Sequence, residues 1–300
     1  MKRTLLISCF VWFLSSSASA GQATSAEEIL QRHLESLGSA PTRSAAKSRV
    51  VEGTASYRVL RGGEGQYTGK AVVVSDGNRT HILLKIEAPQ YVGERFISDG
   101  DKTSVEGTNA NKTRSEFGTF LRSEDLPLRE GLLGGVLTTA WPLLDLDAHK
   151  GKLHFQGLLS VDGTNLYAAT YQPHKRTGLE ITLYFDPATL HHVRTVYTET
   201  EAVGIATARQ IDMMAASGKK TLSNIPSPDA RSARMTPQRW KIEEQFDSFK
   251  TTDGLTLPSR YDLRFEKQMA DGSTKTVEWE VTATRVLNNV PVDARNFQVQ

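Results

Sequence analysis

The chain has 300 residues, of which 38% are hydrophobic and 23% are charged. This length supports a substantial hydrophobic core without help from disulfides or metals. The formal net charge is only +2, and without Lys2 and Arg3 the basic and acidic residues are equal in number, which argues against a nucleic-acid-binding or anionic-membrane-binding surface.

The first twenty residues have the three parts of a secretory signal peptide. Positions 2–3 are basic, positions 5–14 are apolar, and the segment ends in Ala18-Ser19-Ala20. We expect cleavage after Ala20 and an exported, periplasmic protein. No second long apolar run follows, so we expect no transmembrane segment after cleavage. Cys9, the single cysteine, lies in the leader, which leaves the mature chain without a disulfide or a thiol nucleophile.

A helix is predicted immediately after the leader, between Ser25 and Gly38. Ser25 and Glu28 form a capping box, and Gly38 is placed to end the helix. Apolar residues recur between them at helical spacing: Ile29, Leu30, Leu34 and Leu37. His33 lies on the same face, where we expect it to be a packed residue rather than a ligand.

From Ser48 onward the hydrophobic period changes from 3.6 residues to 2. The stretches 80–86, 179–185, 255–265 and 277–283 each alternate between apolar and polar residues, as strands of antiparallel sheets do. Asp-Gly pairs, which favour tight hairpin turns, punctuate the chain. They are Asp76-Gly77, Asp99-Gly100, Asp162-Gly163, Asp253-Gly254 and Asp271-Gly272. The sequence therefore predicts a long antiparallel meander.

The most apolar segment is Leu126–Leu146, which we call the plug. Its apolar residues cover most of the circumference of a helix, so we predict a helix that is buried. Gly134-Gly135 and Pro142 weaken a membrane-spanning interpretation, and the uninterrupted part is shorter than the roughly 20 residues that a bilayer requires. A buried helical plug needs something to enclose it, and the curved sheet is the candidate.

The stretch 217–238 is rich in Ser, Pro, Lys and Arg and interrupts the strand pattern. We expect a long surface loop there rather than a domain boundary, because the alternation resumes from Trp240. The chain is therefore predicted to be a signal peptide, residues 1–20, followed by one domain, residues 21–300.

Motifs for catalysis, metals and cofactors are missing from the sequence. The seven histidines include no pair with zinc-ligand spacing, and His191-His192 are expected to be solvated residues at the edge of a turn. Glu243 and Glu244 are neighbours on a predicted strand and so should face opposite sides. We find no nucleophile elbow, phosphate-binding loop or dinucleotide-binding loop. We therefore predict no catalytic residue, no metal site and no cofactor.

What remains is apolar surface facing inward. Aromatic residues at predicted inward positions are Trp141, Trp240, Phe246, Tyr261, Phe265 and Trp279. They fit an ordinary hydrophobic core, or the wall of a cavity, because a strongly curved sheet around a plug is hard to fill completely. Our candidate ligand-binding residues are Leu132, Leu133, Val136, Leu137, Trp141, Tyr261 and Trp279.

Three stretches resemble the LolA/LolB-like superfamily of outer-membrane lipoprotein-sorting proteins. They are the segment from Tyr184 to Leu190, the segment from Asp253 to Arg260, and the terminal run from Asn289 to Asp293 leading to Phe297. The resemblance spans most of the mature chain. It implies an α+β fold, mainly antiparallel: a curved, half-open β-barrel with an N-terminal helix, helical elements in its concave face and a cavity for lipid chains.

These observations lead to a primary hypothesis and two alternatives. The first is a non-catalytic periplasmic carrier for lipoprotein acyl chains or another lipid-like apolar ligand, with an envelope protein as a possible partner. The second is a structural or interaction module in cell-envelope assembly with a fully packed core. The third is an exported hydrolase, which requires His and carboxylate side chains to meet in one cleft.

Overall fold

The computed structural model describes residues 23, 25–175, 177–199, 239–269 and 272–299. Within these residues, twelve strands form one antiparallel sheet in the order β5-β4-β3-β2-β1-β12-β11-β10-β9-β8-β7-β6. The expected antiparallel fold is confirmed. The predicted signal peptide and the predicted loop at 217–238 lie outside the described residues.

The strands are long in the centre of the sheet and short at one edge. They are β1 (Ser48–Arg61), β2 (Gln66–Asp76), β3 (Arg79–Ile86), β4 (Glu94–Ser98), β5 (Thr103–Gly107), β6 (Lys152–Val161), β7 (Thr164–Gln172), β8 (Leu179–Phe185), β9 (His192–Glu199), β10 (Trp240–Thr252), β11 (Leu255–Gln268) and β12 (Thr274–Asn288). The helical elements are α1 (Ala26–Leu37), α2 (Ala40–Ala45), α3 (Glu116–Ser123), α4 (Leu126–Arg129) and the 3-10 turns η1 (Gly135–Leu137), η2 (Pro142–Asp145) and η3 (Ala294–Phe297).

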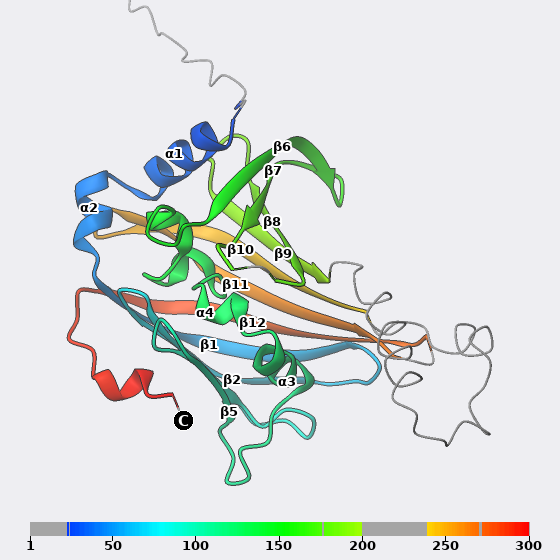
Figure 1. Cartoon of the computed structure of the whole chain (residues 1–300). Coiled ribbons are helices and arrows are strands. Elements are labelled where there is room, and N and C mark those ends of the chain that lie inside the picture. The colour runs from blue at the N-terminus through cyan, green and yellow to red at the C-terminus, as the bar shows by residue number, and fades with distance from the viewer. Residues whose placement is uncertain (1–22, 24, 176, 200–238, 270–271, 300) are drawn as a thin grey trace, which may run out of the picture.

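The sheet is open and curved. β1 pairs with β12, which brings the two ends of the domain together in the middle of the sheet, while β5 and β6 are its edges. Figure 1 shows the β6–β9 part turned toward the β1–β5 part, with the plug inside the curve and α1 across one end. This is the half-open arrangement expected from the sequence.

The predicted hairpins form where the Asp-Gly pairs stand. Asp162-Gly163 joins β6 to β7, and Asp253-Gly254 joins β10 to β11. In both pairs the aspartate and the glycine have positive φ, between 50° and 82°, as a tight hairpin turn requires. Asp76-Gly77 and Asp99-Gly100 connect further neighbouring strands, and Asp271 lies outside the described residues.

α1 begins and ends as predicted. The Ser25 side chain accepts a hydrogen bond from the backbone N–H of Glu28 at 3.1 Å, and Gly38 follows the last turn with φ of 135°. Its buried face carries Ile29, His33 and Leu37, which pack against the open end of the curved sheet. Among the described residues, no helix is long and apolar enough to cross a membrane.

The inward faces of the strands supply the core. β3 alternates between buried and more exposed positions, and β11 does the same over its central residues. In β12 the four residues from Thr276 to Trp279 are all buried. Of the six aromatic residues expected to face inward, five are buried, and Trp240 is partly exposed beside Phe120. On the other face, ion pairs cross the central strands, as between Arg264 and Glu278 at 2.7 Å.

Candidate functional site

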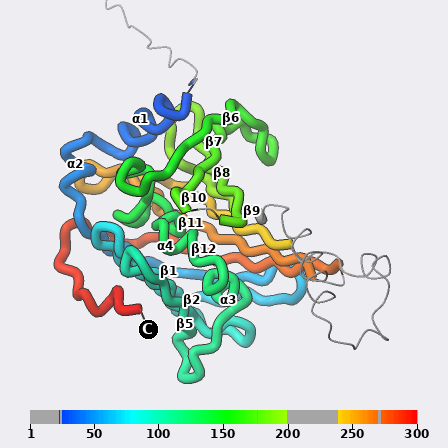
Figure 2. Tube along the Cα trace, in the orientation of Figure 1, coloured from blue at the N-terminus to red at the C-terminus, as the bar shows by residue number. Residues whose placement is uncertain are grey.

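The plug folds as a series of short turns rather than as the single helix that the sequence predicts. α4 is followed by η1 and η2, with irregular chain between them. Gly134 and Gly135 have positive φ values of 82° and 49°, which end a right-handed helix, and Pro142 lacks the N–H that a continuing helix needs. The prediction of one helix is wrong, and the winding path is clear in Figure 2. The prediction of burial is confirmed.

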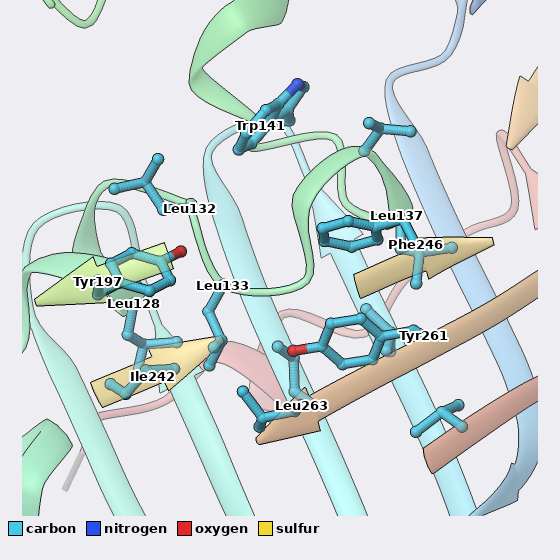
Figure 3. Close-up of a cluster of buried hydrophobic side chains, with 14 of the residues drawn as sticks. Leu128, Leu132, Leu133, Leu137, Trp141, Tyr197, Ile242, Phe246, Tyr261 and Leu263 are labelled. Atoms are coloured by element: carbon cyan, nitrogen blue, oxygen red, sulfur yellow. The ribbon is translucent and has the colours of Figure 1, made fainter. Parts of the chain in front are cut away.

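All seven candidate ligand-binding residues are buried, each with 3% or less of its surface exposed. Figure 3 shows Leu132, Leu133 and Leu137 of the plug above side chains of the sheet that include Tyr197 and Tyr261. The Tyr261 ring stacks on Phe246 at a centroid distance of 5.3 Å. Trp279 lies in an adjoining aromatic cluster with Tyr57, Tyr91 and Phe117. Leu132, Leu133, Val136, Leu137, Trp141, Tyr261 and Trp279 thus belong to one continuous core.

The plug packs closely against the sheet, since Leu132, Leu133, Val136 and Leu137 are each 2% exposed or less. Beside Arg49 and Val136 there is a hollow of about 20 Å³, room for little more than one water molecule. A larger hollow of about 570 Å³ lies on the outer surface of α1 and α2, next to Leu30 and Leu34, and is open to solvent. An acyl chain can therefore reach the concave face only if the plug moves.

A small set of hydrogen bonds ties the plug backbone to the sheet. Arg49 of β1, which is 4% exposed, donates from Nη1 to the carbonyl oxygen of Val136 at 2.6 Å. The N–H of Thr139 donates to Ser75 Oγ at 2.9 Å, and its side-chain hydroxyl donates to the carbonyl oxygen of Gly77. Burial lowers the pKa of Arg49 to about 10, which leaves it charged at neutral pH.

Glu244 of β10 lies at the centre of the interface between the plug and the sheet. Its carboxylate accepts hydrogen bonds from the N–H of Gly134 at 2.7 Å, from the Tyr197 hydroxyl at 2.6 Å and from the Tyr261 hydroxyl at 2.8 Å. None of its surface is exposed. Burial raises the pKa of Glu244 to about 7, although the three hydrogen bonds act in the opposite direction. This is a costly place for a carboxylate, and the donors around it are what make it tolerable.

Its neighbour Glu243 faces the other side of the sheet, as the strand geometry predicts. Glu243 forms ion pairs with Arg194 and Lys241, each at 3.0 Å. Burial acts to raise the pKa of Glu243, but hydrogen bonds from Gln245 and Lys241, together with the charges of Lys241 and Arg194, outweigh it, so that the pKa is lowered. The adjacent carboxyls therefore have opposite pKa shifts because Glu243 has cationic partners and the neighbours of Glu244 are uncharged.

Trp141 anchors the far end of the plug between two buried histidines. Its ring stacks on His192 with centroids 4.7 Å apart, and its Nε1–H donates a long hydrogen bond of 3.5 Å to His33 Nε2. His33 Nδ1 then donates to the carbonyl oxygen of Leu190 at 3.0 Å, and burial lowers the His33 pKa to about 4. His33 is packed as predicted. The prediction of a solvated His192 is wrong, because none of its surface is exposed.

Glu244 and Tyr197 are not among the site residues predicted from the sequence, although the sequence of β10 contains a signal. In β10 the inward positions alternate as Ile242, Glu244 and Phe246, so a carboxylate interrupts an otherwise apolar series. A charge at an inward position of a strand requires a partner.

Among the described residues, no group of three or more His, Cys, Asp and Glu side chains is placed to bind a metal ion.

The described part of the protein is an open antiparallel sheet that curves around a buried plug. No protein-family model and no curated protein matches the sequence. Among solved structures, the LolA superfamily protein NE2245 from Nitrosomonas europaea matches with 11% identity and a TM-score of 0.45, covering 92% of this chain and 98% of that chain.

A putative outer membrane lipoprotein-sorting protein domain from Vibrio parahaemolyticus matches with 10% identity and a TM-score of 0.41, covering 89% of this chain and 97% of that chain. MucB in the MucA/MucB complex of Pseudomonas aeruginosa matches with 11% identity and a TM-score of 0.23, covering 88% and 100%. All three solved structures are at most 11% identical to this chain, with TM-scores below 0.5.

Proposed function

We propose that this protein is a non-catalytic periplasmic carrier that holds an acyl chain of a lipoprotein, or another lipid-like apolar ligand, in the space that the plug occupies. The observation that carries the proposal is the nature of the plug itself. It is an apolar segment without a continuous helix, it fills the concave face of an open sheet, and it is tied there by separate polar contacts.

The plug and an acyl chain are occupants of similar energy for the concave face. Burying an acyl chain with about 15 methylene groups contributes roughly 12 kcal/mol, at about 0.8 kcal/mol per group. Exposing the five apolar plug side chains among our candidates costs about 8–15 kcal/mol, at roughly 1.5–3 kcal/mol each. The two quantities nearly cancel, so useful affinity requires the displaced plug to pack again over the bound chain.

A disulfide lock tests whether the plug must move. The variant Ser75→Cys/Thr139→Cys places a bond beside the existing contact between the N–H of Thr139 and Ser75 Oγ. A matched control, Thr251→Cys/Thr256→Cys, bridges paired residues of the β10–β11 hairpin whose Oγ1 atoms are 2.9 Å apart. Disulfide formation is verified by mass.

Native mass spectrometry after purification from the envelope then measures bound lipid. We expect the unmodified protein, the control and the reduced lock to retain lipid, and the oxidised lock to lose it. Equal lipid retention by the oxidised and reduced locks would show that the plug does not gate the site. Lipid-free protein in every case would refute the carrier proposal.

Substitutions in the plug provide a second test. A charged residue in place of Leu137 or Trp141 should abolish lipid retention at a denaturant concentration where the sheet is still folded, because the strands pair through their own backbone hydrogen bonds. Circular dichroism and lipid extraction on the same samples measure both properties. Equal loss of both would mean that these residues are ordinary core.

A second candidate function is an interaction module of the cell envelope with a permanently packed interior. The near absence of space beneath the plug favours it, as does the larger hollow on the outside of α1 and α2. The lipid-free outcome above, combined with a stable monodisperse protein, would support this candidate over the carrier.

A further inference from the structure

Three polar side chains on neighbouring strands form a rigid cluster beneath the plug. Tyr197 pairs with Ile242, and Tyr261 pairs with Phe246, so Glu244 stands midway between the two pairing positions on β10. Tyr197, Glu244 and Tyr261 therefore point to the same face and meet diagonally across three strands. Because all three belong to the sheet, the cluster keeps its geometry whether or not the plug is in place.

The remaining donor to this carboxylate comes from the plug. The N–H of Gly134 donates to the Oε1 atom that also accepts from Tyr261. Figure 3 shows Tyr197 and Tyr261 among buried apolar side chains that include Leu133 and Leu263. When the plug withdraws, Glu244 loses one hydrogen bond in an apolar setting. Leaving a buried charged acceptor short of a donor is unfavourable by more than a neutral hydrogen bond contributes.

A ligand that takes the place of the plug must therefore replace the Gly134 N–H. On the basis of the carrier function proposed above, we propose that Glu244, with Tyr197 and Tyr261, is the polar subsite for an amphiphile with a long acyl or alkyl chain. The uncharged end of this amphiphile donates a hydrogen bond from a hydroxyl group or an amide N–H. Carboxylate or phosphate ends are disfavoured because they set a second negative charge against Glu244 at short range.

A purely structural role for the cluster makes a different prediction. If Glu244 only holds Gly134 in place, bound ligands never contact it, and the chemistry of their polar end does not affect affinity. Ligand selectivity therefore separates a binding subsite from a structural tie.

The test compares three probes on the full-length protein at pH 8, where Glu244 is ionised. Palmitamide carries N–H donors, N,N-dimethylpalmitamide has the same chain and carbonyl without a donor, and palmitate is anionic. Each competes with the fluorescent apolar probe 1-N-phenylnaphthylamine. We expect palmitamide to bind about tenfold more tightly than either of the other probes, since a hydrogen bond to a charged acceptor strengthens binding by about that factor.

Two variants assign the preference to a residue. Glu244→Gln keeps the shape but replaces the charged acceptor with a neutral one, and it should reduce the preference to about threefold or less. The control, Glu94→Gln, changes a carboxyl that is also fully buried but bonds to Ser115 of the α3 cap, and it should retain the wild-type preference. The wild-type comparison of the two amides does not depend on either variant folding.

The outcomes separate this inference from the carrier function. Equal affinities of wild-type protein for the two amides, or palmitate binding as tightly as palmitamide, would overturn the subsite and leave the carrier standing. A selectivity that survives in Glu244→Gln would also overturn it. Failure of the fluorescent probe and all three ligands to bind would overturn both.

Discussion

Replacing Glu244 with glutamine should change how the stability of the protein depends on pH. The folded carboxyl has a pKa of about 7, raised from 4.5 mainly by burial. The folded state thus holds this proton more tightly than the unfolded state does. The stabilising contribution is fully present below the unfolded pKa and is lost as the pH rises through about 7.

The size of the effect follows from the pKa. A shift of this size corresponds to about 3 kcal/mol, at roughly 1.4 kcal/mol for each pH unit. Glutamine has no proton to lose. Its carbonyl oxygen can still accept from Gly134, and its amide can donate to a tyrosine hydroxyl. We therefore expect Glu244→Gln to gain about 3 kcal/mol relative to wild type between pH 4.5 and pH 8.

Urea unfolding followed by tryptophan fluorescence at pH 4.5, 6 and 8 measures this difference. Glu94→Gln should lose a second, separate part of the pH dependence, because burial also raises the Glu94 pKa to about 7. The two effects should add, since Glu94 bonds to Ser115 and not to the plug. Parallel stability profiles for wild type and Glu244→Gln would refute the reasoning.

Three further substitutions have defined outcomes. Gly135→Ala places a Cβ 2.7 Å from Phe246 at a φ of 49°, so urea unfolding should show a loss of about 1–3 kcal/mol. Arg49→Met removes the donor to the Val136 carbonyl, so amides 134–146 should exchange faster with deuterium while those of β3 are unchanged. Ser25→Ala removes the α1 cap and should cost about 1 kcal/mol, measured by thermal unfolding.

Much of the fold was readable from local patterns. The α1 cap at Ser25 and the hairpins at Asp162-Gly163 and Asp253-Gly254 depend on residues a few positions apart, and they form as predicted. The alternation in β3 fixed which residues face the core. Such features are predictable because the physical cause and its effect lie within the same short stretch.

The plug was harder to predict because its conformation is decided by distant residues. Apolar periodicity favours a helix, but the positive φ values of Gly134 and Gly135 suit a path that brings Gly134 to Glu244, 110 residues away in sequence. His192 was misjudged for the same reason, since Trp141 covers it from another part of the chain. No local pattern reports which segment will cover a given residue.

The separation between the plug and its partners has a consequence for the order of folding. A chain of short 3-10 turns cannot persist alone, and its contacts on β9, β10 and α1 exist only after much of the sheet has assembled. We therefore expect a late intermediate in which the strands are paired and the concave side is still bare. Lipid supplied during refolding should be captured at that moment far faster than lipid offered to the finished protein.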